Sequence, residues 1–101
     1  LGISNLNNCG DKALSVGEQS ILDIKLLNAF NSQMGIASKD SSIVNINDLS
    51  MNNVLTCAAA YKKKQEFNGG IININNSFVC DNFKDEQKID NFSIINKLVK
   101  N

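Results

Sequence analysis

The segment GIASKDSSIVNINDLSMNN, residues 35–53, decides the fold, because the chain repeats it imperfectly on both sides. The decapeptide SILDIKLLNA (residues 20–29) aligns with SIVNINDLSM (residues 42–51) at an offset of 22 residues. A further copy, GGIININNSF (residues 69–78), aligns with the central one at an offset of 28. The longer interval fits an inserted loop, YKKKQEFNGG, at residues 61–70. A unit of about 22 residues is too small to bury its own apolar face, so consecutive units must stack.

Apolar and polar residues alternate within each copy. In the central copy, Val44 and Ile46 alternate with Asn45 and Asn47. This period of two is typical of a strand that buries one face, and β-branched residues favour the pleated conformation. A shorter strand is predicted before the main one in each unit, and another after a polar corner. The preceding strands are expected at residues 14–16, 36–38 and 58–60, and the following ones at 27–29, 49–51 and 78–80, the last after a slip of one residue.

Three stacked strands per unit predict an all-β fold, a parallel β-helix (solenoid) of about four coils with a period of about 22 residues. Equivalent residues would form inward ladders along the axis, spaced by about 4.8 Å. The predicted ladders are Leu14/Ile36/Ala58, Leu22/Val44/Ile72, Ile24/Ile46/Ile74, Leu27/Leu49/Phe78 and Ala29/Met51/Cys80. The alternative is a leucine-rich repeat, whose period of about 20–29 residues overlaps this one. Its register is met only in part, because Val54 stands where an asparagine is required.

Composition bounds the domain organisation and the class of function. With 101 residues we expect a single module, residues 1–101, excised from a longer protein. Ten lysines balance ten acidic residues, and the chain has neither His nor Arg. The missing histidine excludes Ser-His-Asp and Cys-His catalysis within the chain, and zero net charge argues against nucleic-acid binding. No apolar run is long enough to span a bilayer, so we expect no membrane insertion.

The three cysteines, Cys9, Cys57 and Cys80, lack the paired spacing of a zinc or redox motif. Cys9 and Cys80 are predicted about three coils apart, roughly 14 Å at the spacing of paired strands. A disulfide requires Cα atoms within about 7 Å, so we expect no bridge between these two. Cys57 aligns with Gly35, at a different corner from Cys80. The sequence therefore predicts three free thiols.

Three segments carry a resemblance to a known family: DKALSVGEQS (residues 11–20), GIASKDSS (residues 35–42) and AAAYKKKQEFNGG (residues 58–70). In order and spacing they resemble a right-handed parallel β-helix segment of bacterial surface and secreted proteins, some of which carry a spore-coat-H-like domain. The resemblance covers roughly residues 9–80. It implies membership of the broad pectate-lyase-like superfamily and an extracellular or cell-surface location. It implies no catalytic residues.

The strongest candidates for chemistry are the carboxylates of Glu18 and Asp40, which align one coil apart. Stacked carboxylates repel and need a cation, a proton or a lysine nearby, and Lys39 is adjacent in sequence. This corner is a candidate for binding calcium or a sugar, and an ion-paired or solvated corner is the plainer interpretation. We predict no catalytic residue, no metal site and no cofactor.

A second candidate site is the loop residue Tyr61 with the only cationic run, Lys62, Lys63 and Lys64. Positive charge beside an aromatic ring suits an anionic glycan, whereas the plainer interpretation is a solvated loop that discourages edge pairing. Two outward rows complete the polar surface. They are Asp23/Asn45/Asn73 and Lys25/Asn47/Asn75, whose amides either stabilise the stack or contact a sugar.

These features favour a non-catalytic β-solenoid module of a surface or secreted protein, acting as a structural scaffold or a carbohydrate-binding face. Its expected partners are polysaccharide and the flanking coils or domains of the same chain. The alternative is a fragment of a carbohydrate-active enzyme, a polysaccharide lyase or glycoside hydrolase, with its site outside this segment. A third hypothesis is an assembly module, because the open ends of a solenoid expose unpaired strand edges.

Overall fold

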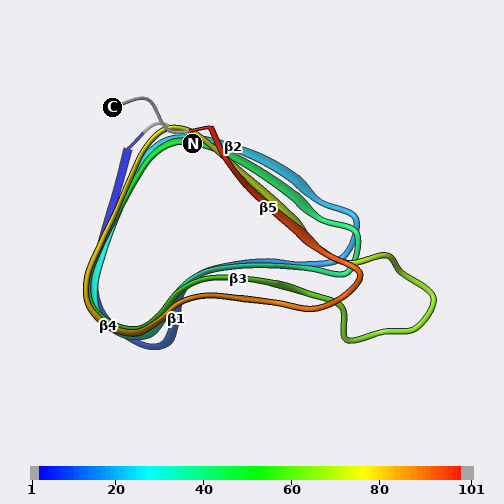
Figure 1. The fold of residues 1–101 in the computed structure, drawn as a ribbon, viewed down its shortest axis with the longest axis horizontal. Helices are drawn as coiled ribbons and strands as arrows, with labels where there is room; N and C mark the ends of the chain where they lie inside the picture. The colour runs from blue at the N-terminus through cyan, green and yellow to red at the C-terminus, as the bar shows by residue number, and fades with distance from the viewer. Residues whose placement is uncertain (1–2, 99–101) are drawn as a thin grey trace.

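The protein forms a parallel β-helix. The structure, a computed structural model, describes residues 3–98, and side chains from residue 14 onward. Its strands form one parallel sheet in the order β1-β2-β3-β4-β5. They are β1 (Ile3–Val16), β2 (Ile21–Lys39), β3 (Ile43–Tyr61), β4 (Ile71–Ile89) and β5 (Ile94–Lys97). In Figure 1 successive strands follow one another around a common three-sided outline, and the loop between β3 and β4 projects beyond it.

The register between coils confirms the predicted repeat. Residues of β2 pair with β3 at the offset of 22, from Ile21 with Ile43 onward. β3 and β4 pair at the offset of 28 as far as Ile46 with Ile74. The pairing then slips by one residue, as predicted, so that Leu49 lies beside Phe78. The inserted segment is therefore confined to the loop at residues 62–70, and the coils on either side stay aligned.

The prediction of three short strands per coil is wrong in one respect, because each coil contains a single long strand that bends at its corners. β2 and β3 each run for 19 residues. One of these bends follows the strands predicted at residues 27–29, 49–51 and 78–80. It lies at Asn31, Asn53 and Asn82, whose φ angles of 59°, 57° and 54° are left-handed. Asparagine tolerates this conformation, so one residue turns the chain while pairing continues on both sides.

The five predicted ladders form the core. Their members in β2 and β3 are buried with the exception of Leu22, which is partly buried. Ile46 and Ile74 are fully buried, and Ile24 is 3 % exposed. Burying one such side chain contributes roughly 1.5–3 kcal/mol, so the stack is held together chiefly by these apolar ladders.

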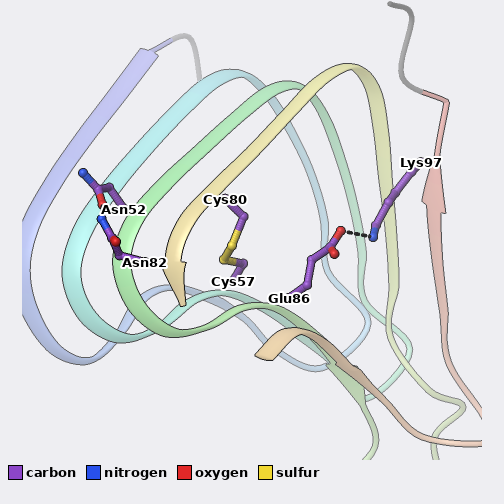
Figure 2. Close-up of a disulfide and its surroundings, with 6 residues drawn as sticks. All are labelled: Asn52, Cys57, Cys80, Asn82, Glu86 and Lys97. Carbon is purple, nitrogen blue, oxygen red and sulfur yellow. Dashed lines mark hydrogen bonds and ion pairs between the residues drawn. A yellow bond between two sulfur atoms is a disulfide. The ribbon is translucent and has the colours of Figure 1, made fainter. Parts of the chain in front are cut away.

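The prediction of three free thiols is wrong, because Cys57 and Cys80 form a disulfide with a Cα–Cα distance of 6.4 Å. A Cβ on Gly35 would lie 2.6 Å from Met51 Sδ, so the two sides of the coil approach each other there. Cys57 follows Gly35 in the next coil and Cys80 pairs in register with Met51. The two cysteines thus lie on different sides of the coil but across a narrow interior, where Figure 2 shows them joined.

The sequence also predicted that Cys9 and Cys80 are not bridged. Because Cys80 is bonded to Cys57, the absence of a Cys9–Cys80 bridge is confirmed. The side chain of Cys9 itself lies outside the described residues.

Candidate functional site

The two candidate sites predicted from the sequence form a single corner. The loop at residues 62–70 folds back against the turns that precede β2 and β3, where Glu18 and Asp40 lie. Lys64 Nζ forms an ion pair with Glu18 Oε1. The backbone N–H groups of Lys63 and Lys64 donate hydrogen bonds to Asp40 Oδ1, with distances of 2.6 and 3.1 Å. We refer to Glu18, Asp40 and residues 62–64 as the clamped corner.

Asp40 is the centre of the clamped corner. It is only 2 % exposed and has a left-handed φ of 51°, a conformation that Asp tolerates in turns. Its backbone N–H donates to the Tyr61 carbonyl oxygen (3.2 Å), and its own carbonyl accepts from Gln19 N–H (2.9 Å). The hydrogen bond from Lys64 N–H is the largest influence that lowers the pKa of Asp40, with Lys63 N–H and the charge of Lys39 acting in the same direction against partial desolvation. Asp40 therefore connects successive coils in two ways: its carboxylate binds the loop after β3, and its backbone carbonyl binds the turn before β2.

Glu18 and Lys64 form the solvent-facing part of the corner, and both side chains are about half exposed. The hydrogen bond and charge of Glu18 raise the pKa of Lys64. The sequence suggested Lys39 as the cation that separates Glu18 from Asp40. Lys64 takes that place at Glu18, while Lys39 acts on Asp40 only through its charge.

A second clamp, centred on Asp90, was missed by the sequence analysis. Asp90 Oδ2 accepts a hydrogen bond from Lys62 N–H (2.8 Å), while Oδ1 accepts from Ser93 Oγ (2.6 Å) and Phe92 N–H (3.0 Å). Partial desolvation opposes ionisation, but these hydrogen bonds, led by that of Ser93, lower the pKa of Asp90. Lys62 Nζ lies 3.8 Å from the centre of the Phe92 ring. The Asp-x-x-Ser spacing at a turn is the signal that would have identified this residue.

The expected glycan-contact residues are thus largely engaged within the protein. The ammonium of Lys62 stacks on Phe92 and that of Lys64 binds Glu18. Lys63 is exposed. Tyr61 lines a shallow, mainly apolar depression of about 310 Å³ together with Met34 and Ile89. In residues 14–98 no three acidic or cysteine side chains group as metal ligands would.

A row of polar side chains runs along the outside of the main strands. Asn45 Nδ2 donates to Asp23 Oδ1 (2.9 Å), Asn73 Nδ2 to Asn45 Oδ1 (2.8 Å) and Asn96 Nδ2 to Asn73 Oδ1 (2.8 Å). We call this chain of three hydrogen bonds the amide ladder. The amide ladder joins β2, β3, β4 and β5. The predicted outward row Asp23/Asn45/Asn73 therefore continues to Asn96 and links all four strands.

The second predicted row, Lys25/Asn47/Asn75, lies beside the amide ladder, and we call it the outer row. Lys25, Asn47 and Asn75 are exposed, and none of the three side chains forms a hydrogen bond within the described part of the chain. Together with Asp23 and Asn45 they line an open groove of about 370 Å³. The residues that line this groove include no aromatic side chain.

Comparison with known proteins provides no relative: no family model, curated protein or solved structure matches this chain. The described residues include no helix with the length and apolar character needed to cross a membrane.

Proposed function

We propose that this chain is a non-catalytic β-solenoid module that serves as a rigid scaffold in a surface or secreted protein, within the class of pectate-lyase-like parallel β-helices. The observation that carries the proposal is the amide ladder. Stacked amides that bond to one another, from Asp23 to Asn96, hold adjacent coils in register. Polar groups used in this way contribute to stiffness rather than to ligand binding.

The clamped corner and the second clamp at Asp90 support the same proposal. Asp40 and Asp90 direct their carboxylate oxygens at backbone N–H groups of the loop, and Glu18 is paired with Lys64. A general acid or base needs a free position for the substrate, within hydrogen-bond distance of the transferred proton. Carboxylates that fasten a long loop to the coils fit a structural purpose.

The extracellular location is part of the proposal, and the disulfide supports it. Disulfides persist in secreted and surface proteins and are rare in the reducing cytosol. The Cys57–Cys80 bond links β3 to β4.

Amide hydrogen exchange tests the scaffold proposal. A rigid stack is expected to show continuous protection through β2, β3 and the first half of β4. Removing ladder amides in the double variant Asn45→Ala/Asn73→Ala should shorten protection times across these strands. The matched variant Asn47→Ala/Asn75→Ala deletes amides of the outer row and should leave them unchanged. Equal effects of the two variants would argue against the amide ladder as the source of stiffness.

Carbohydrate binding is the second candidate, favoured by the unengaged side chains of the outer row. Asn47 and Asn75 present amides, and Lys25 an ammonium, along one side of the groove. Such groups suit hydroxyl or carboxylate groups of a polysaccharide. Affinity electrophoresis in gels that contain neutral or acidic polysaccharides tests this. Asn47→Ala/Asn75→Ala should abolish retardation, and Gln65→Ala, a change at an exposed residue outside the groove, should preserve it.

A further inference from the structure

The inserted loop ends with the one Asn-Gly pair of the sequence, Asn68-Gly69. The side-chain amide of an asparagine lies within reach of the backbone nitrogen of the next residue, so the two groups can react inside the chain. Glycine favours this reaction, because it has no side chain to shield its nitrogen and its backbone rotates freely. The pair therefore has the composition in which an asparagine most readily loses its amide.

The structure leaves both reacting groups without another partner. Asn68 is exposed, and its side chain forms no hydrogen bond within the described part of the chain. The N–H group of Gly69 donates no hydrogen bond to these residues either. Solvent water reaches the amide, and no hydrogen bond of the amide or of the attacking nitrogen has to be broken before they react.

The backbone on either side of this amide is held closely. The Asn68 N–H donates to Ser41 Oγ and the Asn68 carbonyl accepts from Ser41 N–H, both at 2.8 Å. A Cβ on Gly69 would overlap Ser93 Oγ and the Phe92 carbonyl oxygen. Two hydrogen bonds to Ser41 thus close the end of the loop, and there is no room beside Gly69 for a longer backbone.

We propose that Asn68 is a site of spontaneous deamidation, and that the reaction prevents the end of the loop from closing on Ser41 again. When this end opens, the Gly69 backbone nitrogen attacks Asn68 Cγ and a C–N bond forms. The side-chain nitrogen takes up the proton that Gly69 loses and leaves as ammonia, so that a five-membered succinimide remains. One water molecule then opens the ring at either carbonyl and yields aspartate or isoaspartate. Water is the only co-reactant, and nothing is oxidised or reduced.

The isoaspartate product changes the path of the backbone. The chain then runs through the former side chain and is longer by one methylene group. Gly69 cannot move toward Ser93, and β4 is held in register with β3 from Ile71 onward. The added length therefore carries residue 68 away from Ser41. This inference goes beyond the scaffold function, because it assigns a chemical modification to the loop.

Two asparagines that precede serine provide a comparison within the same chain. Both are exposed, but their side chains are engaged: Asn31 Oδ1 accepts from Asn53 Nδ2 and Asn76 Nδ2 donates to Asp48 Oδ1, each at 2.7 Å. In both cases the serine that follows lies within a strand, where pairing restricts the backbone. These two amides should persist under conditions in which Asn68 reacts.

Peptide mapping by mass spectrometry tests the site on protein kept at mildly alkaline pH. Asn68 should be converted to the acid at least about tenfold faster than Asn31 or Asn76, because one hydrogen bond of ordinary net strength corresponds to about a factor of ten in local opening. Equal rates at the three positions would overturn the proposal.

The opening step is tested with Asp40→Asn, which weakens the acceptor of the Lys63 and Lys64 N–H groups. Hydrogen bonds to a charged acceptor are roughly twice as strong as neutral ones, so the rate at residue 68, relative to that at Asn76, should rise about three- to tenfold. Asp81→Asn is the same substitution at an exposed residue whose side chain forms no hydrogen bond within residues 14–98, and it should leave this ratio unchanged. An unchanged ratio in Asp40→Asn would contradict a reaction that proceeds through loop opening.

Amide hydrogen exchange of the purified isoaspartyl protein tests the consequence. The Ser41 N–H should exchange at least about tenfold faster than in the parent, because its hydrogen bond to residue 68 is lost. Asn68→Asp, which has the same added charge without the longer backbone, should protect Ser41 as the parent does. The proposal is overturned if the isoaspartyl protein protects Ser41 equally well, or if Asn68→Asp accelerates exchange as much as isoaspartate does.

Discussion

Cys57 and Cys80 are joined across the interior of the β-helix, with Cα atoms 6.4 Å apart and a separation of 23 positions in sequence. One coil earlier, the same two places are occupied by Gly35 and Met51, whose side chain reaches toward the glycine backbone. The interior is therefore narrow at this point in both coils. In one coil a methionine fills the space opposite a glycine, and in the next a disulfide does.

The disulfide predicts the thiol count and a measurable stability. Protein denatured without reductant should react with a thiol reagent at one cysteine, Cys9, and at three after reduction. Replacing both bridged cysteines by alanine should lower the free energy of unfolding by about 2–4 kcal/mol, mainly because the unfolded chain gains freedom. Urea unfolding of the parent and of Cys57→Ala/Cys80→Ala measures the difference. Three reactive thiols before reduction would contradict the bond.

The Ile46 ladder predicts which apolar substitutions matter. Ile46 is fully buried between Ile24 and Ile74. Ile46→Asn should cost about 3–6 kcal/mol, because it loses apolar burial and leaves an amide without water. Ile21→Asn makes the same change at an exposed position in β2 and should cost less than about 1 kcal/mol. Thermal unfolding of both variants checks this, and equal melting temperatures for Ile46→Asn and the parent would show that Ile46 does not face the core.

The end of the inserted loop requires glycine for lack of space. A Cβ on Gly70 would overlap the Ser38 carbonyl oxygen of the neighbouring coil. Gly70→Ala should therefore force the backbone apart and cost about 1–3 kcal/mol. The nearest atom to a Cβ on Gly17, in the turn before β2, is Lys39 Cε at 3.8 Å, an ordinary contact. Gly17→Ala should change stability by no more than about 0.5 kcal/mol, as measured by urea unfolding. A tolerant Gly70→Ala variant would mean that the loop can leave the coil freely.

The clamped carboxylates predict loss of stability in acid. The pKa values of Asp40 and Asp90 are lowered in the folded state, so the unfolded chain binds more protons at low pH. Their stabilisation is complete above the unfolded value of about 3.9 and is lost as pH falls through the lower folded values. Melting temperatures between pH 6 and 2 should fall less steeply for Asp40→Asn and least for Asp40→Asn/Asp90→Asn. A slope in Asp40→Asn identical to that of the parent would contradict this role.

Only part of the candidate site could be predicted from the sequence. Glu18 and Asp40 could be placed at one corner from the repeat, because aligned residues lie in one ladder. Their partners could not, because Lys64 reaches Glu18 from 46 residues away through a loop that has no counterpart in the other coils. Asp90 was missed for the same reason: its partner Lys62 belongs to that loop.

The sequence by itself determined the stacking of coils, the offsets of 22 and 28 residues, the slip before Phe78 and the five inward ladders. Alternating apolar residues set which face is buried, and repetition sets which residues become neighbours, so both can be read along the chain. Tertiary structure alone decided distances across the interior and the path of the insertion. The repeat fixes neighbours along the axis, whereas the width of the coil depends on how far each corner bends. Left-handed Asn53 keeps β3 continuous through its corner, and a narrow interior then joins Cys57 to Cys80.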